Sequence, residues 1–227
     1  AAGDGDLVCV LLEMGADVNL ADEIGGDTPL HWAAANGFED VAHRLLDARA
    51  DASQANADAD APLAMAAMGG HVGKISALIE VCGADAVSHA NLRGETALML
   101  ALLHGRTDGA RALLMAEGID VHTADLAGRT PLMHAAAAGL VDPVKWVLGA
   151  GAAAGATDAG GMTAAELAED NEAPAELIAM LRESAECMGG AAEVALAPGA
   201  SATPGAASAE GAPELVEAPA PSARDDS

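Results

Sequence analysis

The segment of this sequence that comes closest to a nucleotide site is Gly69-Gly70-His71-Val72-Gly73-Lys74-Ile75. Its glycines and lysine are of the types that cradle phosphates in a phosphate-binding loop. That loop also needs a glycine where Met68 stands and a hydroxyl side chain, which binds magnesium, where Ile75 stands. Because both are missing, we expect no nucleotide to bind here.

No other spacing in the sequence predicts a reaction centre. There is no Gly-x-Ser-x-Gly turn to expose a nucleophilic serine, and no His-Glu-x-x-His pair to hold zinc on one helical face. The cysteines, Cys9, Cys82 and Cys187, are too far apart for a zinc ribbon or a disulfide framework. Carboxylates are dispersed along the chain. We therefore expect no enzyme, no catalytic residue, no metal and no cofactor.

Net charge and hydropathy indicate which classes of partner are unfavourable for this chain. The 227 residues carry a net charge of −25 with only 10 Lys and Arg, which repels nucleic acid and anionic lipid over a Debye length of about 8 Å. No uninterrupted apolar run reaches the roughly 18 residues of a membrane span. We expect neither nucleic-acid binding nor membrane insertion. Unpaired cysteines favour a reducing compartment, the cytoplasm or nucleus, although an N-terminal targeting sequence could lie outside these residues.

A repeated pattern underlies the whole chain. Its markers are the triplets Thr28-Pro29-Leu30, Ala61-Pro62-Leu63, Thr96-Ala97-Leu98, Thr130-Pro131-Leu132 and Thr163-Ala164-Ala165, at offsets of 33, 35, 34 and 33. Each of the first four leads into small apolar residues, a glycine, and an apolar stretch with helical spacing. The glycines are Gly37, Gly70, Gly105 and Gly139. The pattern predicts a helix, a turn and a second helix in every repeat.

The segments TPLHWAAANGFEDVAHRLLDARAD and RTPLMHAAAAGLVDPVKWVLGAGA resemble the ankyrin repeat family. This resemblance implies an all-α solenoid of stacked helix-turn-helix pairs joined by β-hairpin-like loops. Two residues depart from the family pattern. Arg49 stands where the family usually has a capping glycine, and Ala61 replaces a threonine, which leaves one helix end and one turn in question.

The resemblance and the period together predict two regions. An ankyrin repeat domain spans residues 1–183, and residues 184–227, rich in Ala, Pro, Gly and Glu, form a disordered tail. Within the domain we expect a half repeat at 5–21, whole repeats at about 22–56, 57–91, 92–125 and 126–158, and a capping repeat at 159–183. In the cap, polar residues from Glu166 to Arg182 are expected to face water.

Two columns of residues are predicted to hold the stack together. The first helices should approach closely through small pairs such as Ala33-Ala34 and Ala135-Ala136. A leucine-rich core should run through all four whole repeats. Its expected members are Leu30, Leu63, Leu98 and Leu132, joined by Leu46, Ile79, Leu114 and Leu148.

The resemblance also implies where a partner binds. In ankyrin-like proteins a concave groove is lined by the hairpin tips and by the solvent side of the first helices. His31 stands where the family's imidazole makes structural hydrogen bonds to a neighbouring loop, whereas His134 is shifted by one position and is expected to face the groove, with a plain packing role as the alternative. The candidate partner-binding residues are Asp27, Trp32, Asn36, Asp58, Asp60, Met68, Leu92, Arg93, Glu95, Leu103, His104, Leu126, Arg129 and His134.

These observations favour a monomeric interaction module that binds a protein through the groove, with a hot spot around Arg93 and Leu103. The alternative is that the chain is the regulatory or targeting ankyrin portion of a larger protein, such as a kinase, ubiquitin-ligase subunit or channel. Neither reading identifies the partner.

Overall fold

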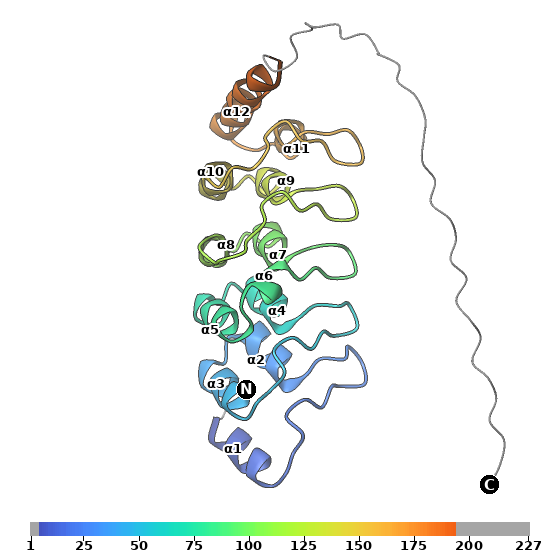
Figure 1. The fold of residues 1–227 in the computed structure, drawn as a ribbon, viewed down its shortest axis with the longest axis vertical. Helices are drawn as coiled ribbons and strands as arrows, with labels where there is room; N and C mark the ends of the chain where they lie inside the picture. The colour runs from blue at the N-terminus through green and yellow to red at the C-terminus, as the bar shows by residue number, and fades with distance from the viewer. Residues whose placement is uncertain (1–4, 194–227) are drawn as a thin grey trace, which may run out of the picture. The chain divides into compact units, whose positions relative to one another are not determined.

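The computed structural model describes residues 5–193, which form a stack of helix pairs (Figure 1). One row holds the first helix of each pair, a second row holds the second helix, and hairpin loops project from the row of first helices. The predicted all-α solenoid is confirmed. The helices before and within the first three pairs are α1 (Gly5–Glu13), α2 (Pro29–Asn36), α3 (Glu39–Asp47), α4 (Pro62–Gly69), α5 (Val72–Cys82), α7 (Ala97–Leu103) and α8 (Thr107–Leu114). The last two pairs are α9 (Pro131–Ala137) with α10 (Val141–Gly149), and α11 (Ala164–Asp170) with α12 (Ala175–Glu193).

The repeated triplet starts each first helix. Thr96, Thr130 and Thr163 precede α7, α9 and α11, and each side chain accepts a hydrogen bond from a backbone N–H in the first turn. Proline takes the first helical position in α2, α4 and α9, where its missing N–H has no intrahelical partner to lose. The local sequence therefore sets where these helices begin.

The turn after each first helix needs a left-handed residue. Gly37, Gly70, Gly105 and Gly139 have φ angles of 71°, 76°, 66° and 67°, which glycine adopts without a steric penalty. The predicted helix-turn-helix is confirmed at all four positions.

The first and second repeats form in spite of their departures from the family pattern. At the end of the first repeat Arg49 takes the left-handed conformation itself, at φ 64°, and Ala59 in the hairpin of the second repeat has φ 60°. Ala61 precedes α4 with extended backbone but has no side-chain oxygen to cap it. The helix end and turn that were in question are present, although the local residues do not favour them.

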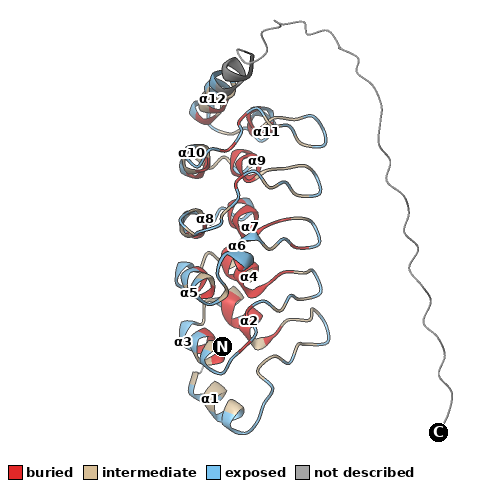
Figure 2. Cartoon of the chain, in the orientation of Figure 1, coloured by how far each residue is buried: buried red, intermediate tan, exposed pale blue. Residues whose placement is uncertain are grey.

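The core lies between the two rows of helices (Figure 2). The small pairs and the column from Leu30 to Leu132 are almost completely buried, as predicted. The second predicted column is only partly right. Its members pack against the core but are half-buried: Leu46, Ile79, Leu114 and Leu148. Successive helical residues point about 100° apart, and the preceding residue of each second helix turns inward instead. The buried column is Leu45, Leu78, Leu113 and Val147.

One helix was not predicted. The segment after α5 forms α6 (Ala84–Ser88), which contacts α5 and α7. Ala86 and Val87 are buried there. Since this burial requires a neighbouring repeat to cover the segment, the short sequence gave no periodic signal for it.

The capping repeat has the expected polar outer side. Glu166, Glu169, Asp170 and Glu176 are exposed, and Arg182 pairs with Glu169. The predicted domain end at residue 183 is too early, because α12 continues to Glu193 through a segment that has no proline. The remainder of the predicted tail, 194–227, lies outside the described residues.

Backbone hydrogen bonds join each hairpin to the next. At every junction, one N–H of a hairpin donates to a carbonyl of the preceding hairpin across 2.9–3.0 Å. The pairs are Ala57 with Gly25, Leu92 with Asp58, Leu126 with Arg93, and Ala159 with Ala127. The hairpins therefore form a continuous edge along one side of the stack.

No helix within residues 5–193 combines the length and the apolar character needed to cross a membrane.

Candidate functional site

The hairpins and the outer side of the first helices form one surface, which we call the hairpin face. Each hairpin begins with an Asp or Asn whose side chain accepts N–H groups two to four residues further on, a turn that these short side chains favour. These residues are Asp22, Asn56, Asn91, Asp125 and Asp158. The hairpin tips are thereby fixed in shape.

The same hydrogen bonds hold some of these carboxylates in the ionised form. The Gly25 N–H donates to Asp22, and the Met162 N–H donates to Asp158, so the pKa of each carboxyl lies below its ordinary value. Asp22 also accepts the indole N–H of Trp32 across 3.2 Å. This bond anchors an exposed aromatic ring on the hairpin face.

Side chains bridge three of the four junctions between hairpins. Asn56 Nδ2 donates to Asp27 across 2.8 Å, and Asn91 Nδ2 donates to Asp60 across 3.0 Å. Further along, Arg129 Nε lies 3.5 Å from Asp158. The bridging side chains fix the spacing of the repeats at these junctions.

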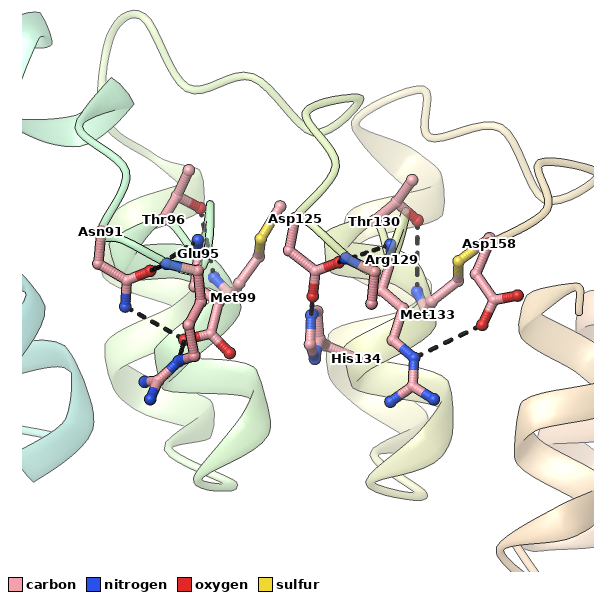
Figure 3. A network of polar contacts seen from close by, with 12 residues as sticks. Asn91, Glu95, Thr96, Met99, Asp125, Arg129, Thr130, Met133, His134 and Asp158 are labelled. Atoms are coloured by element: carbon pink, nitrogen blue, oxygen red, sulfur yellow. Dashed lines mark hydrogen bonds and ion pairs between the residues drawn. The ribbon is translucent and has the colours of Figure 1, made fainter. Parts of the chain in front are cut away.

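The remaining junction, between the third and fourth hairpins, has two carboxylates in the equivalent places and no bond between them (Figure 3). Glu95 instead accepts Arg93 Nε across 2.7 Å, and Asp125 lies 2.9 Å from His134 Nε2. The hydrogen bond that Arg93 donates to Glu95 raises the pKa of Arg93. Each acid is therefore satisfied within its own repeat.

Most of the predicted partner-binding residues reach the surface. Asn36, Asp58, Arg93 and His104 are exposed, and Asp27, Met68 and Arg129 are half-buried. The apolar members are also accessible: Trp32 is 54% exposed, Leu92 66%, Leu103 48% and Leu126 79%.

Three predicted surface residues are buried, and the expectation that they face solvent is wrong. Asp60, Glu95 and His134 are 5%, 8% and 5% exposed. Asp60 and Glu95 accept hydrogen bonds from Asn91, and burial raises the pKa of Asp60. His134 is held beneath its hairpin by Asp125. All three side chains hold the hairpins in place.

His31 has the structural role that the resemblance implied. It is fully buried, its Nδ1 accepts the Thr28 N–H, and its Nε2 donates to the Asp60 carbonyl of the next hairpin across 3.0 Å. Burial lowers the pKa of His31. The imidazole therefore links the first two repeats in its neutral form.

A hollow of about 410 Å³ lies between the third and fourth hairpins. Trp32 and the other candidates of the first two repeats lie elsewhere along the hairpin face. The hollow brings together the predicted residues Arg93, Glu95, Leu103, Leu126, Arg129 and His134. The sequence reasoning missed Asp125, which also lines the hollow. Its recurrence at the same distance before each triplet as Asn56 and Asn91 was an available signal.

A second hollow, of about 490 Å³, lies between the loop that follows α3 and the α5–α6 segment. Asp51, Cys82, Asp85 and His89 line it, and burial raises the pKa of the Cys82 thiol. The sequence did not predict this hollow because it depends on α6. Across the described part of the chain, no three His, Cys, Asp or Glu side chains are grouped so that they could hold a metal ion.

Comparison with protein families agrees with the architecture. A model described as "Ankyrin repeats (3 copies)" matches residues 1–86 and 39–125, and one described as "Ankyrin repeat" matches residues 127–159. Repeats of this kind are generally protein-binding modules.

Individual relatives match in part of their length. Mouse protein phosphatase 1 regulatory subunit 27 is 45% identical over 60 residues, which are 26% of this chain and 38% of that protein. Human 2-5A-dependent ribonuclease is 44% identical over 69 residues, 30% of this chain and 9% of that protein. The Caenorhabditis elegans ankyrin repeat and KH domain-containing protein mask-1 is 34% identical over 148 residues, 64% of this chain and 6% of that protein. The chain thus spans 38% or less of the length of each.

The family models together match well over half of the chain, and the structure has the helix pairs and hairpins in the matched order. The chain belongs to the ankyrin repeat family.

Proposed function

We propose that this chain is an interaction module that binds a protein partner through the groove of its hairpin face. The observation that carries the proposal is the row of exposed apolar side chains there, Trp32, Leu92, Leu103 and Leu126. None of them belongs to the buried core or to the half-buried residues that pack against it. Apolar groups flanked by charge are typical of the centre of a protein interface.

Rigidity of the hairpin face supports the same proposal. The backbone bonds between hairpins and the Asp and Asn turns hold the tips before any partner arrives. A surface that is already ordered loses less conformational entropy on binding. The face therefore suits recognition of a folded protein or of an extended segment.

The proposed module works by binding and not by catalysis, and it needs no cofactor. We place it, as a monomer, in a reducing compartment, the cytoplasm or nucleus. Cys9, Cys82 and Cys187 support this placement because none of them forms a disulfide within the described residues.

A second candidate is the regulatory portion of a longer protein whose activity lies in other residues. The observation that favours it is that the matched relatives extend far beyond the matched region, and one of them is named as a regulatory subunit. Immunoblotting of the source cell with an antibody raised against this chain tests it. A band near 22.3 kDa opposes this candidate, and a much heavier band supports it.

The groove is tested by affinity capture from the source cell with the full chain and the double variant Arg93→Glu with Leu103→Asp. A matched control, Lys145→Glu with Met115→Asp, makes the same changes of charge and polarity on α10 and at the end of α8, away from the hairpin face. We expect a partner that the control retains and the groove variant loses. Circular dichroism and melting must show that both variants fold. Equal capture by both variants would place binding on another surface.

A further inference from the structure

The rim of the hollow between the third and fourth hairpins carries two arginines. Their side chains are accessible, 63% exposed for Arg93 and 42% for Arg129. Arg93 Nε donates a hydrogen bond to Glu95 across 2.7 Å, and Arg129 Nε lies at ion-pair distance, 3.5 Å, from Asp158. The side chains of these two carboxylates are 10% and 7% exposed. The negative charges therefore lie beneath the surface and the guanidinium groups lie in front of them.

The outer nitrogens of both guanidinium groups are free to bind. Among the described residues, none accepts a hydrogen bond from the Nη atoms of Arg93 or Arg129. A guanidinium group presents its N–H groups as a planar fork that matches a carboxylate. Because the buried acids already restrict these side chains, less freedom is lost when an anion binds.

This positive rim stands out from the rest of the hairpin face. The hairpins at 22–27, 56–60 and 158–162 contain no Lys or Arg but carry five aspartates and one glutamate. Two of the ten basic residues of the chain therefore meet at one hollow. The exposed charged groups here are the two guanidinium groups, whereas the carboxylates of Glu95, Asp125 and Asp158 are largely buried.

Two aliphatic side chains complete the hollow. Leu103, at the end of α7, and Leu126, at the tip of the fourth hairpin, are 48% and 79% exposed. Burial of such a side chain against a partner contributes about 25 cal/mol for each Å² removed from water. The hollow therefore offers an apolar contact beside an anion-binding one.

We propose that this hollow recognises a segment of the partner in which an Asp or Glu stands next to an aliphatic side chain. The carboxylate bonds to the outer nitrogens of Arg93 and Arg129, and the aliphatic side chain packs on Leu103 and Leu126. This inference rests on the proposed function and names the chemistry of its partner.

A basic segment fits the same hollow less well. The carboxylates of the hollow already have hydrogen-bond partners. Glu95 accepts hydrogen bonds from Arg93 and Asn91, and Asp125 accepts backbone N–H groups and pairs with His134. The net charge of −25 attracts positively charged segments from a distance, but at physiological salt that attraction is screened beyond about 8 Å. Contacts inside the hollow decide the preference.

The test is a selection of random 12-residue displayed peptides on the immobilised full chain at physiological salt. Parallel selections use the double variant Arg93→Gln with Arg129→Gln, the variants Leu103→Asp and Leu126→Asp, and the control Lys145→Gln on α10. Leu126→Asp tests the hollow independently if the arginine variant fails to fold. Leu126 is largely exposed, and this variant leaves the hydrogen bond from Arg93 to Glu95 intact. Binding of each selected peptide is then compared with that of its Glu→Gln counterpart by fluorescence polarisation.

We expect the wild-type chain and the control to select peptides with an acidic residue beside an aliphatic one, and the other variants not to select them. The Glu→Gln counterparts should bind about tenfold more weakly or worse. Peptides that require Leu103 but prefer Lys or Arg, or show no charge preference, would overturn this inference and leave the groove standing. Peptides that bind all variants equally would contradict both proposals. A selection that enriches no sequence would also overturn the inference.

Discussion

The second and fourth repeats build the same helix pair from different local residues. In the fourth, Gly128 takes the left-handed position of the hairpin and Thr130 caps α9 through its hydroxyl. In the second, Ala59 takes that left-handed position and Ala61 precedes α4 without a capping side chain. The fourth repeat has the residue types that favour its turn and helix start, and the second repeat lacks them.

The core leucine is nevertheless buried in both repeats. Leu63 in α4 and Leu132 in α9 are both almost fully buried, and each helix packs against a first helix on either side. Stacking against the neighbouring repeats therefore stabilises the second repeat although its local residues disfavour the fold. The left-handed Ala59 and the missing cap at Ala61 each cost about 1 kcal/mol. In a solenoid, whose contacts are only between neighbours, such a repeat is the expected weak point.

The largest expected effect comes from removing the core side chain of either repeat. Leu63→Ala and Leu132→Ala should each lower the free energy of unfolding by about 2–5 kcal/mol, because both leave a cavity. Leu63→Ala should in addition split the urea transition, since the second repeat is the weaker of the two. Unfolding curves followed by circular dichroism measure both effects. If Leu132→Ala alone splits the transition, the ranking of the two repeats is reversed.

Exchanging the left-handed residues of the two hairpins should change the free energy of unfolding by a smaller amount. The change should be a decrease in the fourth repeat and an increase in the second. In Gly128→Ala the new Cβ would lie 2.7 Å from the backbone nitrogen of Ala159, at a φ of +76°. It should lower the free energy of unfolding by at least about 1–2 kcal/mol. Ala59→Gly relieves the same strain and should raise that energy by about 0.5–1 kcal/mol, after the entropy cost of glycine. Urea unfolding measures both, and a loss of stability in Ala59→Gly would show that no strain exists there.

Exchanging the helix caps should change stability by about 1 kcal/mol. Ala61→Thr supplies the hydroxyl that α4 lacks, and Thr130→Ala removes the one that caps α9. We expect the melting temperature to rise for the first variant and to fall for the second. Ala61→Val, which has the shape of threonine without the hydroxyl, is the control. A rise of the same size for Val would assign the gain to packing instead of capping.

The smallest expected effect is the pH dependence of the link from His31 to the second repeat. Burial lowers the pKa of His31 below 6.5, so the unfolded chain takes up the proton first as the pH falls. This contribution to stability is therefore fully present above pH 6.5 and is lost as the pH falls from there through the folded pKa. Urea unfolding between pH 5 and 8 measures it against His31→Gln. Parallel pH profiles for the two proteins would contradict the assignment.

The predicted partner-binding residues include both exposed and buried side chains, and two equivalent positions show why. Trp32 and His134 occupy equivalent places in their repeats, yet the first is exposed and the second is buried. Trp32 donates to Asp22 at the edge of its hairpin, while His134 lies beneath Asp125. Position in the repeat alone did not separate these outcomes, because side-chain length and hydrogen-bond partner differ between repeats.

The sequence by itself determined the period, the helix starts at threonine and proline, the glycine turns and the small residues between the first helices. These features depend on residues that are close together in the chain. Only the tertiary structure decided which residue of each second helix turns inward, that α6 forms, and that Arg93 and Arg129 share a hollow across two repeats. These outcomes depend on the neighbouring repeat, because contacts between repeats, and not local propensity, select the conformation there.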